Sequence, residues 1–467
     1  MNARARHHPP LPSTRSAPRF VGAPWVVVSL GLAALALASL GCDARAARPP
    51  LVLVVSLDTV RADRWASAPT PAFDGLAARA DRYPTAVSTA PWTLPSHASM
   101  FTGLWPSEHG AVSFEVDALE DNAHPLHPDH VTLAEALSSA GYHTAGFVAN
   151  TVYLSPRHGL DQGFATWQVR RQRGDGVTRD ALAWVDAQRA GAGRGAPLFL
   201  FLNYMDAHRP YNAPPAPDGR QSVVLLDELI ERVMVRGEGD SPERAELRAD
   251  LLACYDGALA NLDAALGRLF DGLDARGLLD GALVVVTADH GESFGEHGLV
   301  EHSKDVYEPL LRVPFIVKRP GQRAGRDLAA RASSVDVAGL VAEATRVGRA
   351  RFTRLPGTHP VLAENRYSRP QDLVRYGARF RSVRQAWYEG DLKLRVDARG
   401  ATQLFDLAHD PAELRDLALA RPADAARLTA DLARELARAP WPGPDLMPGA
   451  LAPAERVELR ALGYGGD

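Results

Sequence analysis

Cysteine is scarce in this chain: its 467 residues include only two, Cys42 and Cys254. If Cys42, which lies in the N-terminal segment, is acylated, Cys254 is left without a partner, which excludes a disulfide framework. A large excess of charge is also missing, since the formal net charge is -4. This near balance gives no field that would favour nucleic acid as a partner. Stability must come from a hydrophobic core, in which we expect Cys254 to be a small buried residue.

The first 41 residues have the properties of a targeting segment. Arginines precede an uncharged apolar run from 21 to 40, which Gly41 and Cys42 follow. This boundary resembles a bacterial lipoprotein cleavage site with Cys42 as the lipidated residue, although Ser39 stands where an aliphatic residue is usual. An uncleaved anchor is one alternative, because the run approaches the roughly 20 residues of a spanning helix, and plain secretion is another. All three predict an exported chain, and the first two attach it to a membrane, facing the periplasm or the cell exterior.

Apolar, β-rich runs alternate with stretches of helical periodicity after residue 50. Continuous apolar runs are typical of strands covered on both faces. Strands that alternate with helices predict an α/β fold with a mostly parallel sheet flanked by helices. The predicted strands are 51–57, 143–149, 197–204, 282–287 and 313–317, the predicted helices are 131–141 and 247–273, and the polar stretch 237–248 is predicted to be a surface loop.

A change of composition near residue 346 indicates a domain boundary. Residues 346–360 are rich in Arg, Gly and Pro, as in a linker. Short alternating strands between 380 and 407, followed by helical spacing from 422 to 437, predict a smaller α+β subdomain. We therefore expect a targeting segment at 1–41, a catalytic domain at 50–345, a C-terminal subdomain at 360–440 and a tail at 441–467.

Acidic and imidazole side chains follow two of the predicted strands. Asp58 comes directly after the first strand, and Asp289 and His290 follow the strand at 282–287. Ligands collect at the carboxyl ends of parallel strands, so these residues can converge on one ion. Carboxylates with one imidazole suit Ca, Mg, Mn or Zn, and the ligand types do not choose among them. Taken singly, each acid is equally well explained as a helix cap or a loop carboxylate.

Thr93 carries a hydroxyl whose local structure can be predicted from its segment, TLPSHAS. A β-branched residue before a proline-containing turn, followed by helical spacing from Ser96 to Phe101, predicts a strand–turn–helix junction. The start of such a helix favours a bound anion. Beside a divalent cation the Thr93 hydroxyl could be deprotonated and attack phosphorus or sulfur. The alternative is that Thr93 only caps the helix.

Together these motifs resemble the sulfatase family within the alkaline phosphatase superfamily. The similarity runs from about residue 51 to 317 and returns in a C-terminal stretch from 404 to 413. It rests on Leu57-Asp58-Thr59-Val60-Arg61-Ala62-Asp63, on Thr93-x-Pro-Ser-His-x-Ser-x-x-Thr-Gly, on Asp206-x-His208, and on Asp289-His290-Gly-Glu-x-Phe-Gly-Glu-His-Gly. The resemblance implies an alkaline-phosphatase-like α/β fold and a metal-dependent ester hydrolase.

The resemblance also implies roles for individual residues. Thr93 would be both nucleophile and metal ligand, and His208 would hold the anionic group or assist the leaving group. His302 and Lys304 both fall near the position of a second anion-binding residue. The implied metal ligands are Asp58, Thr93, Asp289 and His290, the implied catalytic residues are Thr93 and His208, and the candidate substrate contacts are Asn150, His302, Lys304 and His97, the last of which stands where sulfatases carry arginine.

Two departures from the family pattern bear on mechanism. Thr59 replaces a second carboxylate, which removes one negative ligand. Thr93 replaces the cysteine or serine that sulfatases oxidise to formylglycine, and a threonine cannot yield that aldehyde. Without the aldehyde route, an ester on Thr93 must be released by water or another hydroxyl, so we favour phosphate-type esters slightly over sulfate. The spacing Asp206-x-His208 is too short for the second metal of two-zinc members, so we expect one divalent ion.

The sequence leaves the substrate and two other functions open. The loops 150–173 and 210–239 would set specificity for a small-molecule, glycan or lipid-head-group ester, and neither carries a readable signal. One alternative is an envelope transferase of phosphoglycerol or phosphoethanolamine groups. Another is an inactive binding protein of the same fold, for which Thr59 and His97 are the motivating departures.

Overall fold

The computed structural model describes residues 48–113, 123–191, 194–366, 370–438 and 457. The chain divides into a unit at 1–47 and a compact unit from 48 to 467. The predictions for the targeting segment and Cys42 therefore lie outside the described residues, as does nearly all of the tail. Among the described helices, none has the length and apolarity needed to cross a bilayer.

An eight-stranded sheet forms the centre of the second unit, in the order β10-β2-β9-β6-β1-β5-β3-β4. The neighbours β6, β1, β5, β3 and β4 all run parallel, whereas β9 is antiparallel to both β6 and β2. This confirms the predicted α/β fold. The strands are β1 (Leu51–Leu57), β2 (Asp81–Arg82), β3 (His143–Val148), β4 (Thr166–Val169), β5 (Leu198–Tyr204), β6 (Leu283–Ala288), β9 (Phe315–Lys318) and β10 (Arg326–Asp327).

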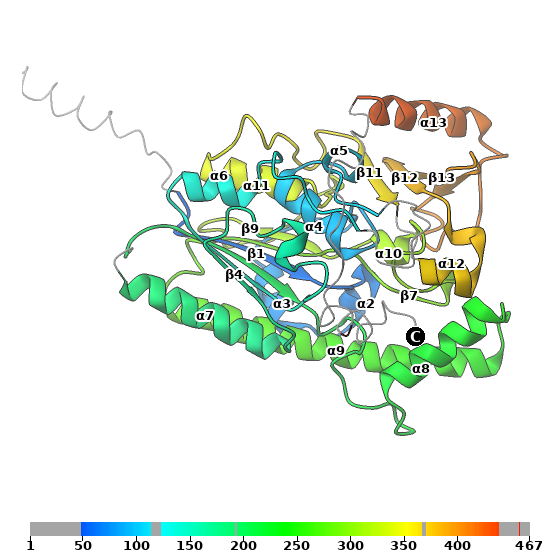
Figure 1. Cartoon of the computed structure of the whole chain (residues 1–467), viewed down its shortest axis with the longest axis horizontal. Helices are drawn as coiled ribbons and strands as arrows, with labels where there is room; N and C mark the ends of the chain where they lie inside the picture. Colours follow the sequence, from blue (N-terminus) through cyan, green and yellow to red (C-terminus); the bar gives the residue numbers. More distant parts are fainter. Residues whose placement is uncertain (1–47, 114–122, 192–193, 367–369, 439–456, 458–467) are drawn as a thin grey trace, which may run out of the picture. The chain divides into compact units, whose positions relative to one another are not determined.

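Helices cover both faces of this sheet (Figure 1). Every residue of the central strands β1, β5 and β6 is buried, which explains why their sequences are continuously apolar. On one face lie α3 (Pro71–Ala77), α7 (Gly174–Ala190) and α9 (Pro242–Ala275), and on the other lie α4 (Thr93–Thr102), α6 (Leu133–Ser139) and α11 (Asp336–Thr345).

The long helix α9 corrects one prediction. It begins at Pro242, so part of the stretch 237–248 is helical rather than loop. Ser241 caps it by accepting a hydrogen bond from the Arg244 amide, and proline suits the first helical position, where its missing N–H costs nothing. The first buried residue of α9 is Leu247. The opening turns are therefore solvated, which explains their polar sequence.

A smaller antiparallel sheet follows in the C-terminal region, in the order β11-β12-β13-β14. Its strands are β11 (Val361–Asn365), β12 (Arg384–Glu389), β13 (Leu392–Asp397) and β14 (Thr402–Asp406), and α13 (Pro422–Leu436) packs against them. Lys393 of β13 is buried between Glu308 and Glu413, and Arg395 pairs with Asp305. Because Glu308 and Asp305 belong to the segment after β8 (Val300–Glu301), the small sheet holds that segment in place.

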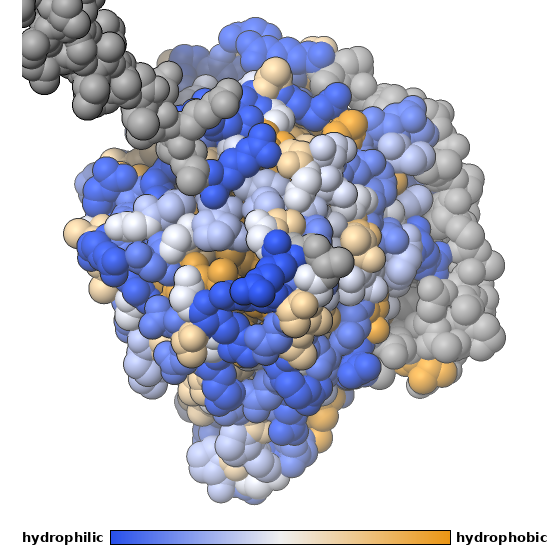
Figure 2. All heavy atoms as spheres, turned by 90° about the vertical axis from the view of Figure 1, so that its left-hand side faces the viewer, coloured by the Kyte–Doolittle hydropathy of each residue, from blue (hydrophilic) through white to orange (hydrophobic). Residues whose placement is uncertain are grey.

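Surface and core agree with a fold stabilised without disulfides. Cys254 is a buried free thiol, as expected. On the face drawn in Figure 2 hydrophilic residues dominate the coloured surface, and hydrophobic ones lie in small separate areas. Scattered hydrophobic residues of this kind are normal on soluble domains and need no partner to cover them.

Candidate active site

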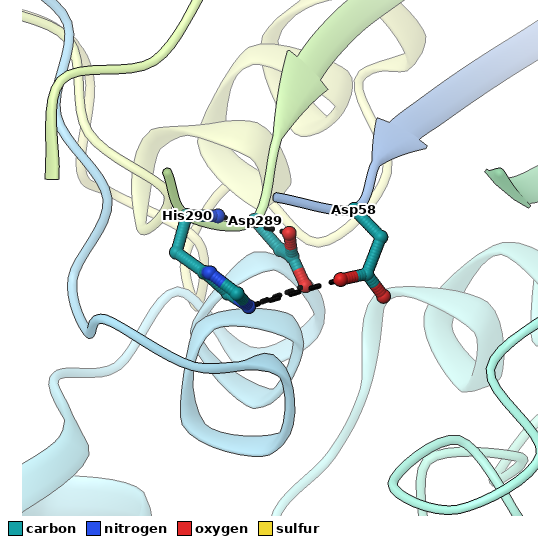
Figure 3. A group of neighbouring side chains, drawn as sticks. All are labelled: Asp58, Asp289 and His290. Carbon is teal, nitrogen blue, oxygen red and sulfur yellow. Dashed lines mark hydrogen bonds and ion pairs between the residues drawn. The ribbon is translucent and has the colours of Figure 1, made fainter. Parts of the chain in front are cut away.

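The two predicted acids emerge side by side because their strands are paired. β1 and β6 are parallel neighbours in which Leu57 lies opposite Ala288, so the next residues, Asp58 and Asp289, leave the same edge of the sheet. His290 follows directly, and Figure 3 shows the three side chains pointing toward one another. One ligand atom from each lies within 4.8 Å of the others, and all three side chains are buried. The sequence prediction that these residues meet is borne out.

Three polar atoms without a hydrogen-bond partner converge here: Asp58 Oδ1, Asp289 Oδ2 and His290 Nε2. His290 Nε2 lies 3.8 Å from the first and 3.5 Å from the second. His290 Nδ1 donates to the Gly291 carbonyl, so Nε2 carries the lone pair. Buried polar atoms are rarely left unsatisfied, and two carboxylate oxygens facing an imidazole lone pair fit a divalent cation.

The electrostatics of the three side chains lead to the same conclusion. Burial, with the neighbouring Asp58 carboxylate, raises the pKa of Asp289 well above its usual range. Burial lowers the pKa of His290 to about 4, against the opposing effect of Asp58. Adjacent buried carboxylates are costly unless a cation compensates them. Within the described part of the chain, no other group of three His, Cys, Asp or Glu residues offers such a site.

Thr93 is the first residue of α4. Two isolated bridges at Val87, to Arg312 and Ser333, and bends from Thr89 to Trp92 precede it, so the predicted turn and helix are present but the predicted strand is wrong. Pro91 lacks the N–H that a strand within a sheet would use. The N-cap is Trp92, and no side chain caps this end, so Thr93 does not have the capping role that was the alternative.

Asn150 joins the Thr93 hydroxyl to Asp58. Asn150 Oδ1 accepts the backbone N–H groups of Val152 and Tyr153, which fixes the orientation of the amide. Its Nδ2 then donates to Asp58 Oδ2 at 3.0 Å and to Thr93 Oγ1 at 3.3 Å. The Thr93 hydroxyl and the Asp58 carboxylate therefore share one amide donor.

His97 lies one helical turn after Thr93 in α4. Its Nδ1 donates to the Thr93 carbonyl at 2.8 Å and lies 3.7 Å from Asp289 Oδ2. Its Nε2 is 2.9 Å from the hydroxyl of Ser56, the residue before the last in β1. The ring is fully buried, and burial lowers the pKa of His97 to about 4, so it is neutral at pH 7.

Thr59 occupies the position where the family carries a second acid. Its backbone has φ 61°, an uncommon conformation for a β-branched residue. The side chain turns away from the site and donates to the Ala207 carbonyl at 2.7 Å. The Thr59 amide instead donates to Asp289 Oδ1 at 3.2 Å, which leaves Oδ2 of Asp289 facing His290. This contact comes from the backbone, so the Thr59 side chain itself supplies no ligand atom to the site.

The two candidates for a second anion-binding residue have different surroundings. The His302 ring centroid lies 4.6 Å from that of His290 and 5.2 Å from that of His208, so three imidazoles follow one another outward from the acids. Lys304 is buried and pairs with Asp372 at 3.2 Å. Glu301 and Ser303, on either side of His302, both have positive φ, so this short segment is sharply turned.

Glu292 was not assigned a role from the sequence. It is fully buried and lies 3.1 Å from His302 Nδ1. Burial raises its pKa well above the usual range. The sequence did offer one indication of a role for Glu292, since it lies two residues after His290 in the same motif. Its partner His302, however, is ten residues further along the chain and comes close to Glu292 only because the loop between them folds back.

A cation site of this composition at the carboxyl edge of this sheet defines a class, the metal-dependent ester hydrolases of the alkaline phosphatase superfamily. Residues 50–347 match the family model described as Sulfatase, and the chain belongs to that family.

Individual relatives agree with this membership. The chain is 24% identical over 482 residues to the multifunctional alkaline phosphatase superfamily protein of Trinickia caryophylli, covering 79% of this chain and 91% of that protein. It is 26% identical over 289 residues to an ulvan-active sulfatase of Formosa agariphila, covering 54% of this chain and 52% of that protein. The chain thus spans about half the length of the second relative.

Solved structures share the fold at low identity. A phosphonate monoester hydrolase from Silicibacter pomeroyi superposes with a TM-score of 0.64 at 20% identity, over 83% of this chain and 95% of that one. A protein in complex with its substrate D-glucosamine-2-N,6-O-disulfate superposes with a TM-score of 0.66 at 17% identity, over 85% and 99%. Family and relatives favour an ester hydrolase over a head-group transferase or an inactive binding protein.

Proposed function

We propose that this chain hydrolyses sulfate or phosphate-type esters with Thr93 as the nucleophile, and that phosphate and phosphonate esters are slightly favoured. One observation carries the proposal. The Thr93 hydroxyl stands at the first residue of α4, and the Asn150 amide bridges it to the unsatisfied acid Asp58. A hydroxyl beside a cation site and at a helix start is suited to attack an anionic ester.

The proposed reaction has two displacements. In the first, Thr93 Oγ1 gives up its proton and bonds to phosphorus or sulfur, the bond to the leaving oxygen breaks, and that oxygen takes up a proton. In the second, water attacks the threonyl ester, the bond to Oγ1 breaks, and Thr93 regains its proton. We assign one divalent ion to Asp58, Asp289, His290 and Thr93; when bound, it supplies charge stabilisation for the hydroxyl and the ester oxygens.

His208 and His302 are assigned to the substrate. Both are buried imidazoles that follow His290 outward, so they can hold an ester oxygen or give a proton to the leaving oxygen. Glu292 would orient His302 through Nδ1. Lys304 is compensated by its pair with Asp372 and is the weaker candidate for direct contact. Asn150 would reach the bound ester through the same amide that contacts Thr93.

The preference for phosphate-type esters over sulfate esters follows from the absence of a formylglycine aldehyde at position 93. A formylglycine hydrate releases sulfate by collapsing to the aldehyde, a route that Thr93 cannot take. A threonyl ester must instead be attacked at its central atom. The similarity to a multifunctional superfamily member and to the fold of phosphonate monoester hydrolases supports this preference.

We also propose that the chain is exported and membrane-attached through its N-terminal segment.

A substrate panel tests the proposal. We expect the purified protein to hydrolyse 4-nitrophenyl phosphate diesters or phenylphosphonate monoesters faster than 4-nitrophenyl sulfate, with each assayed in Mg, Mn, Ca and Zn. The expected ratio of kcat/KM is about 10-fold, equivalent to about 1.4 kcal/mol of transition-state stabilisation. A faster sulfate ester would overturn the preference while keeping the hydrolase. No turnover of any ester with any of these ions would overturn the hydrolase itself.

We infer that His97 positions Thr93 rather than touching substrate, because its two nitrogens face the Thr93 carbonyl and Ser56 inside the core. His97→Ala removes two buried hydrogen bonds and leaves a cavity. We expect kcat to fall about 10- to 100-fold with little change in KM, and the free energy of unfolding to fall by about 2–4 kcal/mol.

Steady-state kinetics and urea unfolding measure the two effects of His97→Ala, and His97→Gln, which can restore one hydrogen bond, should recover part of both. A rise in KM at constant kcat would instead indicate a substrate contact.

A further inference from the structure

A hollow of about 450 Å³ lies beside the proposed reaction centre. Two of its lining residues border that centre. His208 follows His302 in the row of three imidazoles, and Ala149 precedes Asn150, which contacts Thr93. The rest of the wall comes from residues 171–173, 205–206 and 209–213, together with Gln221. Residues 171–173, 210–213 and 221 fall in the two loops expected from the sequence to set specificity, so a group attached to the ester oxygen would enter this hollow.

Asp206 holds the two walls of the hollow together. Its Oδ1 accepts the Gly174 amide at 3.1 Å from one wall and the Asn212 side-chain amide at 2.6 Å from the other. A side chain at position 174 would bring a Cβ within 2.9 Å of Asp206 Oδ2, so this close approach requires glycine. Burial raises the pKa of Asp206, against the opposing effect of the Gly174 and Asn212 hydrogen bonds.

The arginines of the hollow differ in their partners. Arg209 is compensated, since it pairs with Glu301 at 2.9 Å and with Asp227 at 2.7 Å. Arg171 and Arg173 are exposed, and neither has an ion pair or a side-chain hydrogen bond with any described residue. Both stand at the start of the 17-residue helix α7, whose N-terminal end adds positive potential. The hollow therefore carries two exposed guanidiniums without an ion pair among the described residues, in addition to the Asp206 carboxylate.

We propose that this hollow is a leaving-group subsite that selects esters whose leaving group carries its own negative charge, and that Arg171 and Arg173 are the specificity-determining residues. The inference rests on the proposed function and narrows its substrate class to esters of acidic alcohols, such as sugars or phenols bearing a carboxylate. Arginine suits this role because its planar guanidinium forms paired hydrogen bonds with a carboxylate.

The test compares two aryl esters of the same transferred group, one with a plain nitrophenol and one with a carboxylated nitrophenol as leaving group. The measured quantity is the ratio of kcat/KM for the carboxylated ester to that for the plain ester. Taking this ratio in each variant cancels the difference in acidity between the two leaving groups. We expect Arg171→Gln with Arg173→Gln to lower the ratio about 10-fold or more, because two charge-assisted contacts are lost.

Arg170→Gln is the matched control. Arg170 precedes Arg171 in the same loop but does not line the hollow, and its guanidinium lies 3.6 Å from Asp180. The control should keep the wild-type ratio, and added NaCl should lower the ratio in the wild type more than in the double variant.

Three outcomes would count against the inference. Measurable hydrolysis with an unchanged ratio in the double variant would overturn the subsite while leaving the hydrolase intact. An equal fall in Arg170→Gln would show a general field instead of a specific site, which also overturns it. No turnover of either ester by the wild type would overturn the proposed function, and the subsite with it.

Discussion

Replacing Thr93 with alanine is expected to lower kcat by about 10,000-fold or more, the size of effect seen when an enzyme loses its nucleophile. The reason is positional: the Asn150 amide holds the Thr93 hydroxyl beside Asp58, and no other described hydroxyl shares that contact. Turnover of the best ester from the panel, measured with single-turnover kinetics, checks the expectation. Residual turnover no faster than that of the same divalent cation in solution without the protein would agree with this expectation.

Thr93→Ser is the matched variant, because it keeps the hydroxyl and removes only the methyl group. We expect it to retain activity within about 100-fold of the wild type, and both variants to unfold at urea concentrations close to the wild-type midpoint. If Thr93→Ala hydrolysed phosphate, phosphonate and sulfate esters at wild-type rates, another group would have to be the nucleophile. Trapping of a threonyl ester in acid-quenched wild type would support the assignment directly.

Removal of the divalent cation is expected to abolish activity and to destabilise the fold. Without the ion, Asp58 and Asp289 face each other with unsatisfied oxygens in a buried site. Restoring the ion at 100 times its Kd should add about 2.7 kcal/mol to the free energy of unfolding. Thermal unfolding after chelation, and again after adding back each metal, gives the measurement.

Acidification should weaken cation binding, and the sign follows from Asp289. In the metal-free protein its folded pKa is raised, so this carboxyl takes up a proton as pH falls, whereas the cation binds only the ionised form. The apparent Kd should therefore increase toward acid pH, with protons released on binding. Calorimetric titration in two buffers of different ionisation enthalpy measures that release; a binding heat independent of buffer would contradict it.

Asp289→Asn tests whether the effect of the cation depends on this carboxylate and not on any buried acid. We expect this variant to lose both activity and the stabilisation by added metal. Asp263→Asn is the control, since Asp263 is a buried acid of α9 that accepts the Ala72 and Phe73 amides and plays no part in the cation site. The control should keep the metal-dependent shift in unfolding. A shift that survives in Asp289→Asn would place the cation elsewhere.

Local pattern was sufficient for the sheet and for the centre of the site. The apolar runs of β1, β5 and β6 are readable because strands buried on both faces have no polar side. Once those strands are taken as parallel, the residues after them must share one edge of the sheet, and the pairing of β1 with β6 in the structure then brings Asp58 beside Asp289. The sequence by itself thus determined the α/β class and the edge at which the acids and the imidazole lie.

Tertiary structure decided everything that depends on distant segments meeting. The Thr93 setting was expected to include a strand, but residues 89–92 form bends, and the backbone partners of this segment come from separate parts of the fold: the Val87 amide donates to the Ala332 carbonyl, and the Thr89 carbonyl accepts the Glu364 amide. His97 faces Ser56 and the Thr93 carbonyl, and Arg171 and Arg173 reach the His208 hollow, only through the way in which loops fold over the sheet edge. Side-chain periodicity reports which face of an element is buried, but it carries no information about which remote side chain lies opposite.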